Sequence, residues 1–295
     1  MSKYYCLIAG LPDITLDDTK ITYSVADFKE ETEPVLSGKD KKKMHWFFLK
    51  YDNANLLSYL RKSSFDEFDE RGVFSIDDIK EICELVKEEK KMPSALSVPK
   101  YLPEFINTYY TRFEEEEKDD EVSVYNTLWE DRLSSLYYSE AMKCKSKFLA
   151  SWFELNLNIG NVLAAHNCRE YGLEKEEYIV GNNDVAMQLR HSNARDFGIE
   201  DSSGYITELM QVAEESDLFT REKRLDALRW NWLEDSILYK TFDFESVMAY
   251  LLRLEMIERW VCLSKERGEK TFRDLVTEMK RGSSDALEKF KENNK

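Results

Sequence analysis

Apolar residues recur at steps of three and four along residues 130–171, EDRLSSLYYSEAMKCKSKFLASWFELNLNIGNVLAAHNCREY. Because an α-helix has 3.6 residues per turn, this spacing gathers the apolar side chains on one face of a helix. The pattern therefore predicts one very long helix or two helices that abut.

A shorter helix is predicted over residues 75–91, SIDDIKEICELVKEEKK. It opens with Ser75 and has Asp78 three residues later, a spacing typical of a helix N-cap. It should end before Pro93, because proline breaks a helix interior. Near the N-terminus, the short run YYCLIAG (residues 4–10) admits a strand.

Proline is distributed unevenly along the chain. All five prolines lie within the first 103 residues, and the rest of the chain is rich in good helix formers. This predicts an all-α protein, a pseudo-symmetric array of helical hairpins or three-helix bundles. We divide it into a first helical subdomain (1–112), a second with long helices (113–235), and a C-terminal hairpin that completes a third (236–295). The acidic block 114–121 and the turn-forming GNND of residues 181–184 mark breakpoints.

Two segments of the chain resemble each other. WFFLKYDNANLL (46–57) aligns without gaps to WFELNLNIGNVL (152–163), so that Asp52 matches Asn158 and Asn55 matches Asn161. A glycine follows each copy, Gly72 and Gly172, which suggests a duplicated helical hairpin. Asparagine is mildly unfavourable inside a helix. We therefore expect each of these amides to bond a neighbouring helix end or loop.

The segment TFDFESVMAYLLRLEMIERWVCL (241–263) has the pattern of a largely buried helix. Glu255 and Arg259 stand four residues apart, with the acid first, which favours a helical ion pair. Arg253 projects near the middle of the apolar side. It should extend its charge to solvent, pair with an acid on another helix, or mark a surface that a partner covers.

The charge balance limits the kinds of partner that the chain is expected to bind. The chain carries 58 acidic against 42 basic residues, a formal net charge of −16. This argues against nucleic acid and against adsorption to an anionic bilayer, since both need clustered Lys and Arg. Five dispersed cysteines, with no zinc-like spacing, indicate reduced thiols in a cytosolic protein. The N-terminus is too polar for a secretion signal, and no apolar stretch approaches the ~20 residues that span a bilayer.

Catalytic motifs are not apparent. The sequence has no glycine-rich phosphate loop, and its three histidines do not form a metal-binding pair. Asp196-Phe197-Gly198 matches the magnesium-binding tripeptide of protein kinases, but the other kinase motifs are missing. We expect no catalytic residue, no cofactor, no metal and no small-molecule substrate.

The C-terminal segment resembles the C subunit of archaeal and bacterial A/V-type rotary ATPases, called subunit d in eukaryotic V-type ATPases. The family has an Ala-Tyr pair, a Glu five residues after the Tyr and an Arg four beyond it. The positions that match in register are Phe242, Phe244, Ala249, Tyr250, Glu255 and Arg259. The first repeat copy resembles the family's Asp-x-x-Asn helical motif through Asp52, Asn55 and Arg61, and Asn158 and Asn161 echo it.

The chain departs from the family pattern at three places. Asp243 stands where the family has proline, Ile257 replaces a second glutamate and Trp260 replaces an asparagine. The N-terminal KYYCLIAGLPD and the segment RHSNARDFG have no counterpart. The resemblance is to a divergent, Bacteroidetes-like branch.

The resemblance implies three pseudo-symmetric helical bundles that form a funnel-shaped spacer. Such a subunit lies at the cytoplasmic face of the membrane, without inserting into it. It links the central-stalk subunits to the membrane rotor ring and transmits torque without catalysis. Tyr250, Arg253, Glu255 and Arg259, with the repeat residues, are then candidate structural or interface positions.

Two other functions remain open from the sequence. The first is a helical adaptor, unrelated to ATPases, whose repeat copies line a groove for a peptide or protein partner. The second is an enzyme of unfamiliar type that uses His166 or His191 with nearby acids.

Overall fold

The computed structural model describes residues 3–62, 68–93, 96–116, 122–194, 196–199 and 204–263. Regular secondary structure in these residues is entirely helical, which confirms the all-α fold. The helices are α1 (Tyr5–Gly10), α2 (Val25–Thr32), α3 (Gly38–Lys62), α4 (Ile76–Lys87), α5 (Tyr101–Glu116), α6 (Val122–Ala141), α7 (Lys147–Tyr171), α8 (Lys175–Tyr178), α9 (Asp184–His191), α10 (Ile206–Ala213), α11 (Leu218–Ile237) and α12 (Phe244–Cys262).

The long apolar pattern forms two abutting helices, α6 and α7. They are separated by a short turn after Ala141, and Ser146 begins the second helix by accepting a hydrogen bond from the N–H of Leu149. Ser75 and Asp78 form the expected capping box at α4, and Ser24 and Asp27 form another at α2. The acidic block falls partly outside the described residues, which omit 117–121.

The strand that the run over residues 4–10 admits does not form, because Tyr5–Gly10 is the short helix α1. No strand lies in the described part of the chain to pair with this run, so its backbone bonds within its own turns instead. One backbone hydrogen bond from this region joins it to a residue distant in the sequence. The N–H of Tyr4 donates to the carbonyl of Phe242 at 3.1 Å, which joins the N-terminus to the start of α12.

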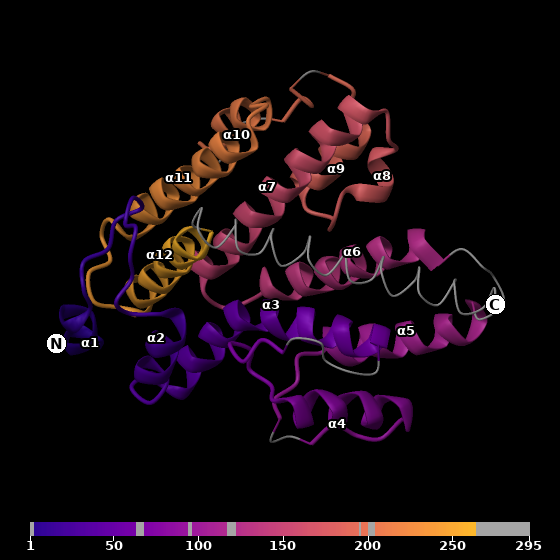
Figure 1. The fold of residues 1–295 in the computed structure, drawn as a ribbon, viewed down its shortest axis with the longest axis horizontal. Helices are drawn as coiled ribbons and strands as arrows, with labels where there is room; N and C mark the ends of the chain where they lie inside the picture. The colour runs from indigo at the N-terminus through magenta and orange to yellow at the C-terminus, as the bar shows by residue number, and fades with distance from the viewer. Residues whose placement is uncertain are drawn as a thin grey trace, which may run out of the picture.

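Two groups of helices diverge from a common junction (Figure 1). One contains α3, α4 and α5, the other contains α7 to α11, and α6 lies between them. α12 lies where the two groups meet, packed against α11 on one side and α2 on the other. The N-terminal segment and the start of α12 therefore meet at the junction.

The first aromatic residue of each repeat copy packs in the same way. Trp46 on α3 lies 6.5 Å from Tyr137 on α6, whose hydroxyl also donates to the Trp46 carbonyl. Trp152 on α7 lies 5.7 Å from Trp232 on α11. In both units the long helix thus packs an aromatic ring against the helix that leads to the next long helix. The division of the chain at residues 112 and 235 stays a prediction.

Within the described residues, no helix combines the length and apolar character needed to cross a membrane. The five cysteines are free thiols. Cys83 and Cys168 are buried, whereas Cys6 and Cys262 are exposed.

Candidate functional site

Two asparagines at equivalent repeat positions make the same pair of hydrogen bonds. Asn55 donates from Nδ2 to the carbonyl of Asp69, and its Oδ1 accepts the N–H of the same residue, both at 3.0 Å. Asn161 contacts Val180 in the same way, with both distances 2.8 Å. Each amide satisfies both backbone groups of one loop residue and so fixes that loop against the long helix. This confirms the predicted role of the two amides and supports the duplication.

One turn earlier, Asp52 holds the start of the next helix. Its two carboxylate oxygens accept the N–H groups of Val73 and Phe74, at 2.8 and 3.0 Å. These residues immediately precede the N-cap of α4, so the side chain on α3 positions α4 directly. We refer to Asp52 with Asn55, and to their repeat counterparts, as the latch positions.

Asn158, the counterpart of Asp52, serves the same purpose with different chemistry. Its Oδ1 accepts the side-chain amide of Asn183 at 2.8 Å, and Asn183 is the N-cap residue of α9. Its Nδ2 donates to the hydroxyl of Tyr205, next to the start of α10, at 2.8 Å. A single neutral side chain thereby positions two helices of the second unit.

The Asp52 carboxylate is almost completely buried, at 1% exposure. Burial raises its pKa to about 6, although the two backbone hydrogen bonds act in the opposite direction. A Cβ on Gly72 would lie 2.3 Å from Asp52 Oδ1, so glycine is required at this approach. Gly172 has a different role, since it ends α7 with a φ of +70°. The two glycines that follow the repeat copies therefore have different roles.

A third contact of this kind involves α12 and α2, and the sequence analysis missed it. The carboxylate of Glu258 accepts the N–H of Val25, the first residue of α2, at 3.3 Å. Glu255 and Glu258 have the same three-residue spacing as Asp52 and Asn55, which is the signal that could have revealed it. The long helix α12 thus holds the shorter helix α2, which lies far from it in the sequence.

Glu255 and Arg259 do not form the predicted pair with each other. Glu255 on α12 pairs with Lys50 on α3 at 2.5 Å. Although burial alone would raise the pKa of Glu255, the Lys50 ammonium keeps it below its usual value. Arg259 instead pairs with Asp226 and, at 3.2 Å, with Glu222, both on α11. The two residues therefore join α12 to two different helices.

Asp226 is the centre of this cluster, and no local sequence pattern marked it. It is 1% exposed and accepts hydrogen bonds from Arg259, from Arg229 at 2.8 Å and from the indole N–H of Trp260 at 2.7 Å. Arg229 also donates to Asn156 on α7 at 3.0 Å. The cluster links α7, α11 and α12, and each of its charges has a partner of opposite sign.

Tyr250 and Phe242 attach α12 to the N-terminal segment. The Tyr250 hydroxyl donates to the carbonyl of Pro12 at 3.0 Å, and its ring stacks on Phe28 of α2 at 5.6 Å. The Phe242 carbonyl accepts the bond from Tyr4. These matched positions make contacts within the chain.

Arg253 pairs with an acid on another helix, one of the three outcomes expected for it. Its guanidinium lies 3.7 Å from Glu234 on α11 and over the ring of Trp230 at 4.9 Å. Burial lowers its pKa, with Glu234 acting in the opposite direction. Its Nε makes no hydrogen bond to any described residue.

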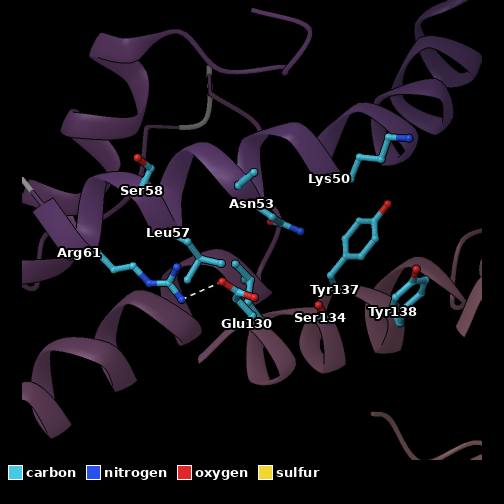
Figure 2. Close-up of a pocket in the computed structure, with 11 residues that line it drawn as sticks. Lys50, Asn53, Leu57, Ser58, Arg61, Glu130, Ser134, Tyr137 and Tyr138 are labelled. Carbon is cyan, nitrogen blue, oxygen red and sulfur yellow. Dashed lines mark hydrogen bonds and ion pairs between the residues drawn. The ribbon is translucent and has the colours of Figure 1, made fainter. Parts of the chain in front are cut away.

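A groove of about 510 Å³ runs between α3 and α6 (Figure 2). Arg61 and Glu130 pair across one end at 2.9 Å, while Lys50 and Tyr137 lie toward the other. The floor between these ends is mostly small or apolar, and Asn53 adds one polar amide to it. The other floor residues are Ala54, Leu57, Ser58, Leu133 and Ser134.

A smaller cavity of about 230 Å³ adjoins this groove and shares Lys50, Tyr137 and Tyr138 with it. Both repeat copies line it, the first with Phe47 and the second with Trp152. Glu255 and Arg259 line it from α12. Two of the resemblance residues, Glu255 and Arg259, therefore meet both repeat copies around this cavity.

The histidines are dispersed. His45 pairs with Glu33 at 3.2 Å, His166 lines a separate cavity beside α10, and His191 is exposed at the end of α9. Among the described residues, no three His, Cys, Asp or Glu side chains lie close enough to hold a metal ion.

The family model DUF2764, described as "Protein of unknown function", matches residues 1–283 of the chain. No curated protein and no solved structure matches it.

Proposed function

The chain belongs to the DUF2764 family, and we propose that it is a non-catalytic central-stalk subunit of a V/A-type rotary ATPase. In this role it couples the rotor shaft to the membrane rotor ring during ATP-driven or ATP-forming ion transport. It is a peripheral protein at the cytoplasmic face of the membrane, with no cofactor, metal or small-molecule substrate.

The observation that carries the proposal is the repeated latch. In two places a long helix uses side chains three residues apart to hold a following loop and the start of a shorter helix, α3 with α4 and α7 with α9. In a third place one side chain, Glu258 of α12, accepts the first N–H of α2. The resemblance to the C/d subunits implies three pseudo-symmetric helical bundles, and these three contacts agree with that plan.

A second support comes from where the resemblance residues lie. Glu255 joins α12 to α3, and Arg259 joins α12 to α11 through the buried Asp226. A spacer that transmits torque must resist relative rotation of its parts. Ion pairs between different units contribute that resistance, because they fix geometry as well as contributing energy.

Purification from native membranes tests the proposal. The tagged chain should co-purify with the shaft and ring subunits and leave the membrane when the peripheral sector is stripped. The double variant Glu255→Gln/Arg259→Met should reduce the ATPase subunits recovered, while Glu154→Gln, an exposed change on α7, should not. Recovery of the chain solely as a free protein would contradict the proposal.

A helical adaptor unrelated to ATPases is the second candidate, favoured by the groove between α3 and α6. A helix-in-groove partner needs an apolar floor with polar ends, and this groove has both. Capture of one stable partner without any ATPase subunit, lost on Leu57→Glu and Ser134→Arg, would favour the adaptor.

A further inference from the structure

A cavity of about 500 Å³ lies between α7, the turn that follows α9, and α10. It is separate from the latch positions and from the charged junction. The residues that matter for its chemistry are Val162, His166 and Arg169 from α7, Asp196 and Phe197 from the turn, and Met210 from α10.

The repeat shows what is unusual about His166. At the spacing that relates Asn55 to Asn161, His166 corresponds to Leu60 on α3. Leu60 packs against the hydrophobic core, whereas His166 lines the cavity. The Nδ1 of His166 is buried and has no hydrogen-bond partner among the described residues. A buried polar atom without a partner is costly and marks a place where a ligand or ordered water can bind.

Phe197 carries a second unfavourable feature. The turn closes with the N–H of Ile199 donating to the carbonyl of Asp196 at 3.3 Å, and its two central residues have positive φ, 53° at Phe197 and 64° at Gly198. Such turns prefer Asn, Asp or Gly, so an aromatic residue at the first position is strained. The ring is nevertheless buried, at 1% exposure, and forms one wall of the cavity.

The charges select the kind of ligand. The Arg169 guanidinium is already engaged, since it donates to the carbonyl of Ala194 at 2.6 Å and lies 3.9 Å from the centre of the Phe197 ring. Asp196 accepts the N–H of Gly198 through one carboxylate oxygen at 2.9 Å, and its side chain is exposed. Glu214, directly after α10, also lines the cavity. The cavity therefore offers two carboxylates, an imidazole nitrogen and apolar walls beside the engaged Arg169.

We propose that this cavity binds a small organic ammonium ion. Its apolar body packs against Val162, Met210 and Phe197, and its N–H donors meet the Asp196 carboxylate and the Nδ1 of His166. An ammonium group has three donors and no acceptor, which suits these acceptors, and the carboxylates disfavour an anionic ligand. This site is independent of the proposed stalk role.

Titration of the full-length chain with three probes of similar size, followed by NMR, tests the proposal. Phenethylammonium should bind saturably, with 2-phenylethanol and 3-phenylpropionate at least about tenfold weaker, because they lack the charge or carry the opposite one. Asp196→Asn and His166→Leu should each weaken phenethylammonium about tenfold or more, a loss typical of one charged or hydrogen-bonded contact.

The two site variants are chosen to preserve the fold. An Asn at 196 can still accept the Gly198 N–H, and a Leu at 166 restores the residue of the first repeat copy, so both should keep the fold. Asp184→Asn and His191→Leu, exposed positions on α9, should leave binding unchanged. Equal binding of the neutral alcohol, no binding of phenethylammonium at millimolar concentration, or unaltered affinity in both site variants would overturn the proposal. The comparison among probes uses the wild-type chain and so holds whether or not a variant folds.

Discussion

Lys50 on α3 and Glu255 on α12 form an ion pair at 2.5 Å although 205 positions separate them in the sequence. The Lys50 ammonium also lies over the rings of Phe47 and Tyr51, at 4.2 and 4.9 Å from their centres. The pair joins the first repeat unit directly to the helix that carries the resemblance residues. It is one of several polar contacts that join α12 to other units.

Replacing Lys50 by Met should destabilise the protein by about 1–3 kcal/mol, because Glu255 keeps its charge in a largely enclosed site without its nearest cation. The figure is below that of a fully buried pair, since the two side chains are 34% and 26% exposed. Urea unfolding measures the loss, and a cycle with Glu255→Gln isolates the coupling. Lys90→Met, which removes an exposed pair with Glu88, should leave the unfolding midpoint unchanged. Equal midpoints for Lys50→Met and wild type would show that the pair contributes nothing.

Asn55→Ala and Asn161→Ala should each cost about 2–4 kcal/mol, because each leaves a loop N–H and a loop carbonyl without their partner. The two losses should be similar, since the hydrogen bonds are the same in both copies. Asn167→Ala is the control, because Asn167 lies exposed on the same helix as Asn161. Thermal unfolding compares the three variants. A loss at one latch position and none at the other would argue against equivalent roles in the two copies.

Asp52 should make stability depend on pH between about pH 4 and 6. Its folded pKa of about 6 lies above the ordinary value near 3.9, so the folded state holds the proton more tightly in this window. The free energy of unfolding should therefore fall as the pH rises through the window, by at most about 3 kcal/mol from this group.

Asp52→Asn removes this contribution, so the difference in unfolding free energy between wild type and variant should change across the window. His45, whose pKa is lowered by burial, acts in the opposite direction near pH 6, and this comparison cancels it because both proteins retain it. At pH 7 the variant should be less stable, because an amide can accept only one of the two N–H groups of Val73 and Phe74. A difference that stays constant from pH 4 to 6.5 would show that Asp52 has an ordinary pKa.

Gly72→Ala and Gly160→Ala should have opposite effects. A Cβ at residue 72 meets Asp52 Oδ1 at 2.3 Å, so the latch must move, and we expect a loss of about 1–3 kcal/mol. A Cβ at residue 160, inside α7, meets nothing within 4 Å, and alanine there should stabilise by about 0.5–1 kcal/mol. Chemical denaturation of both variants under the same conditions measures whether each change lowers or raises the free energy of unfolding. A stable Gly72→Ala would mean that the loop before α4 can shift freely.

The sequence revealed those features that depend on local or repeated patterns. The helices followed from apolar spacing, and the contacts of Asn55 and Asn161 followed from asking why two asparagines occupy equal positions inside helices. Glu255 and Arg259 were paired wrongly because the four-residue rule describes a weak interaction, about 0.3–0.5 kcal/mol. Here stronger partners from α3 and α11 replace it.

Asp226 and Glu258 show the limit of such inference. Asp226 lies in a helix whose local pattern looks ordinary, and its importance comes from cations on the same helix and on α12. The partner of Glu258 is the backbone of Val25, and the three-residue spacing from Glu255 marks the position without indicating that partner. The strand admitted by the N-terminal run does not form for a related reason, since a strand needs a neighbour and the described chain supplies none.

The contact between α12 and α2 becomes possible only after the contacts within the two repeat units. Val25 emerges early in synthesis, whereas Glu258 lies 233 positions later. The first two latches connect segments close in sequence and can close while the chain is still growing. The third contact can form only after residue 258 has been made, so a chain terminated before α12 keeps the early latches yet leaves α2 without its long helix. Synthesis of α12 is thereby coupled to completion of the junction.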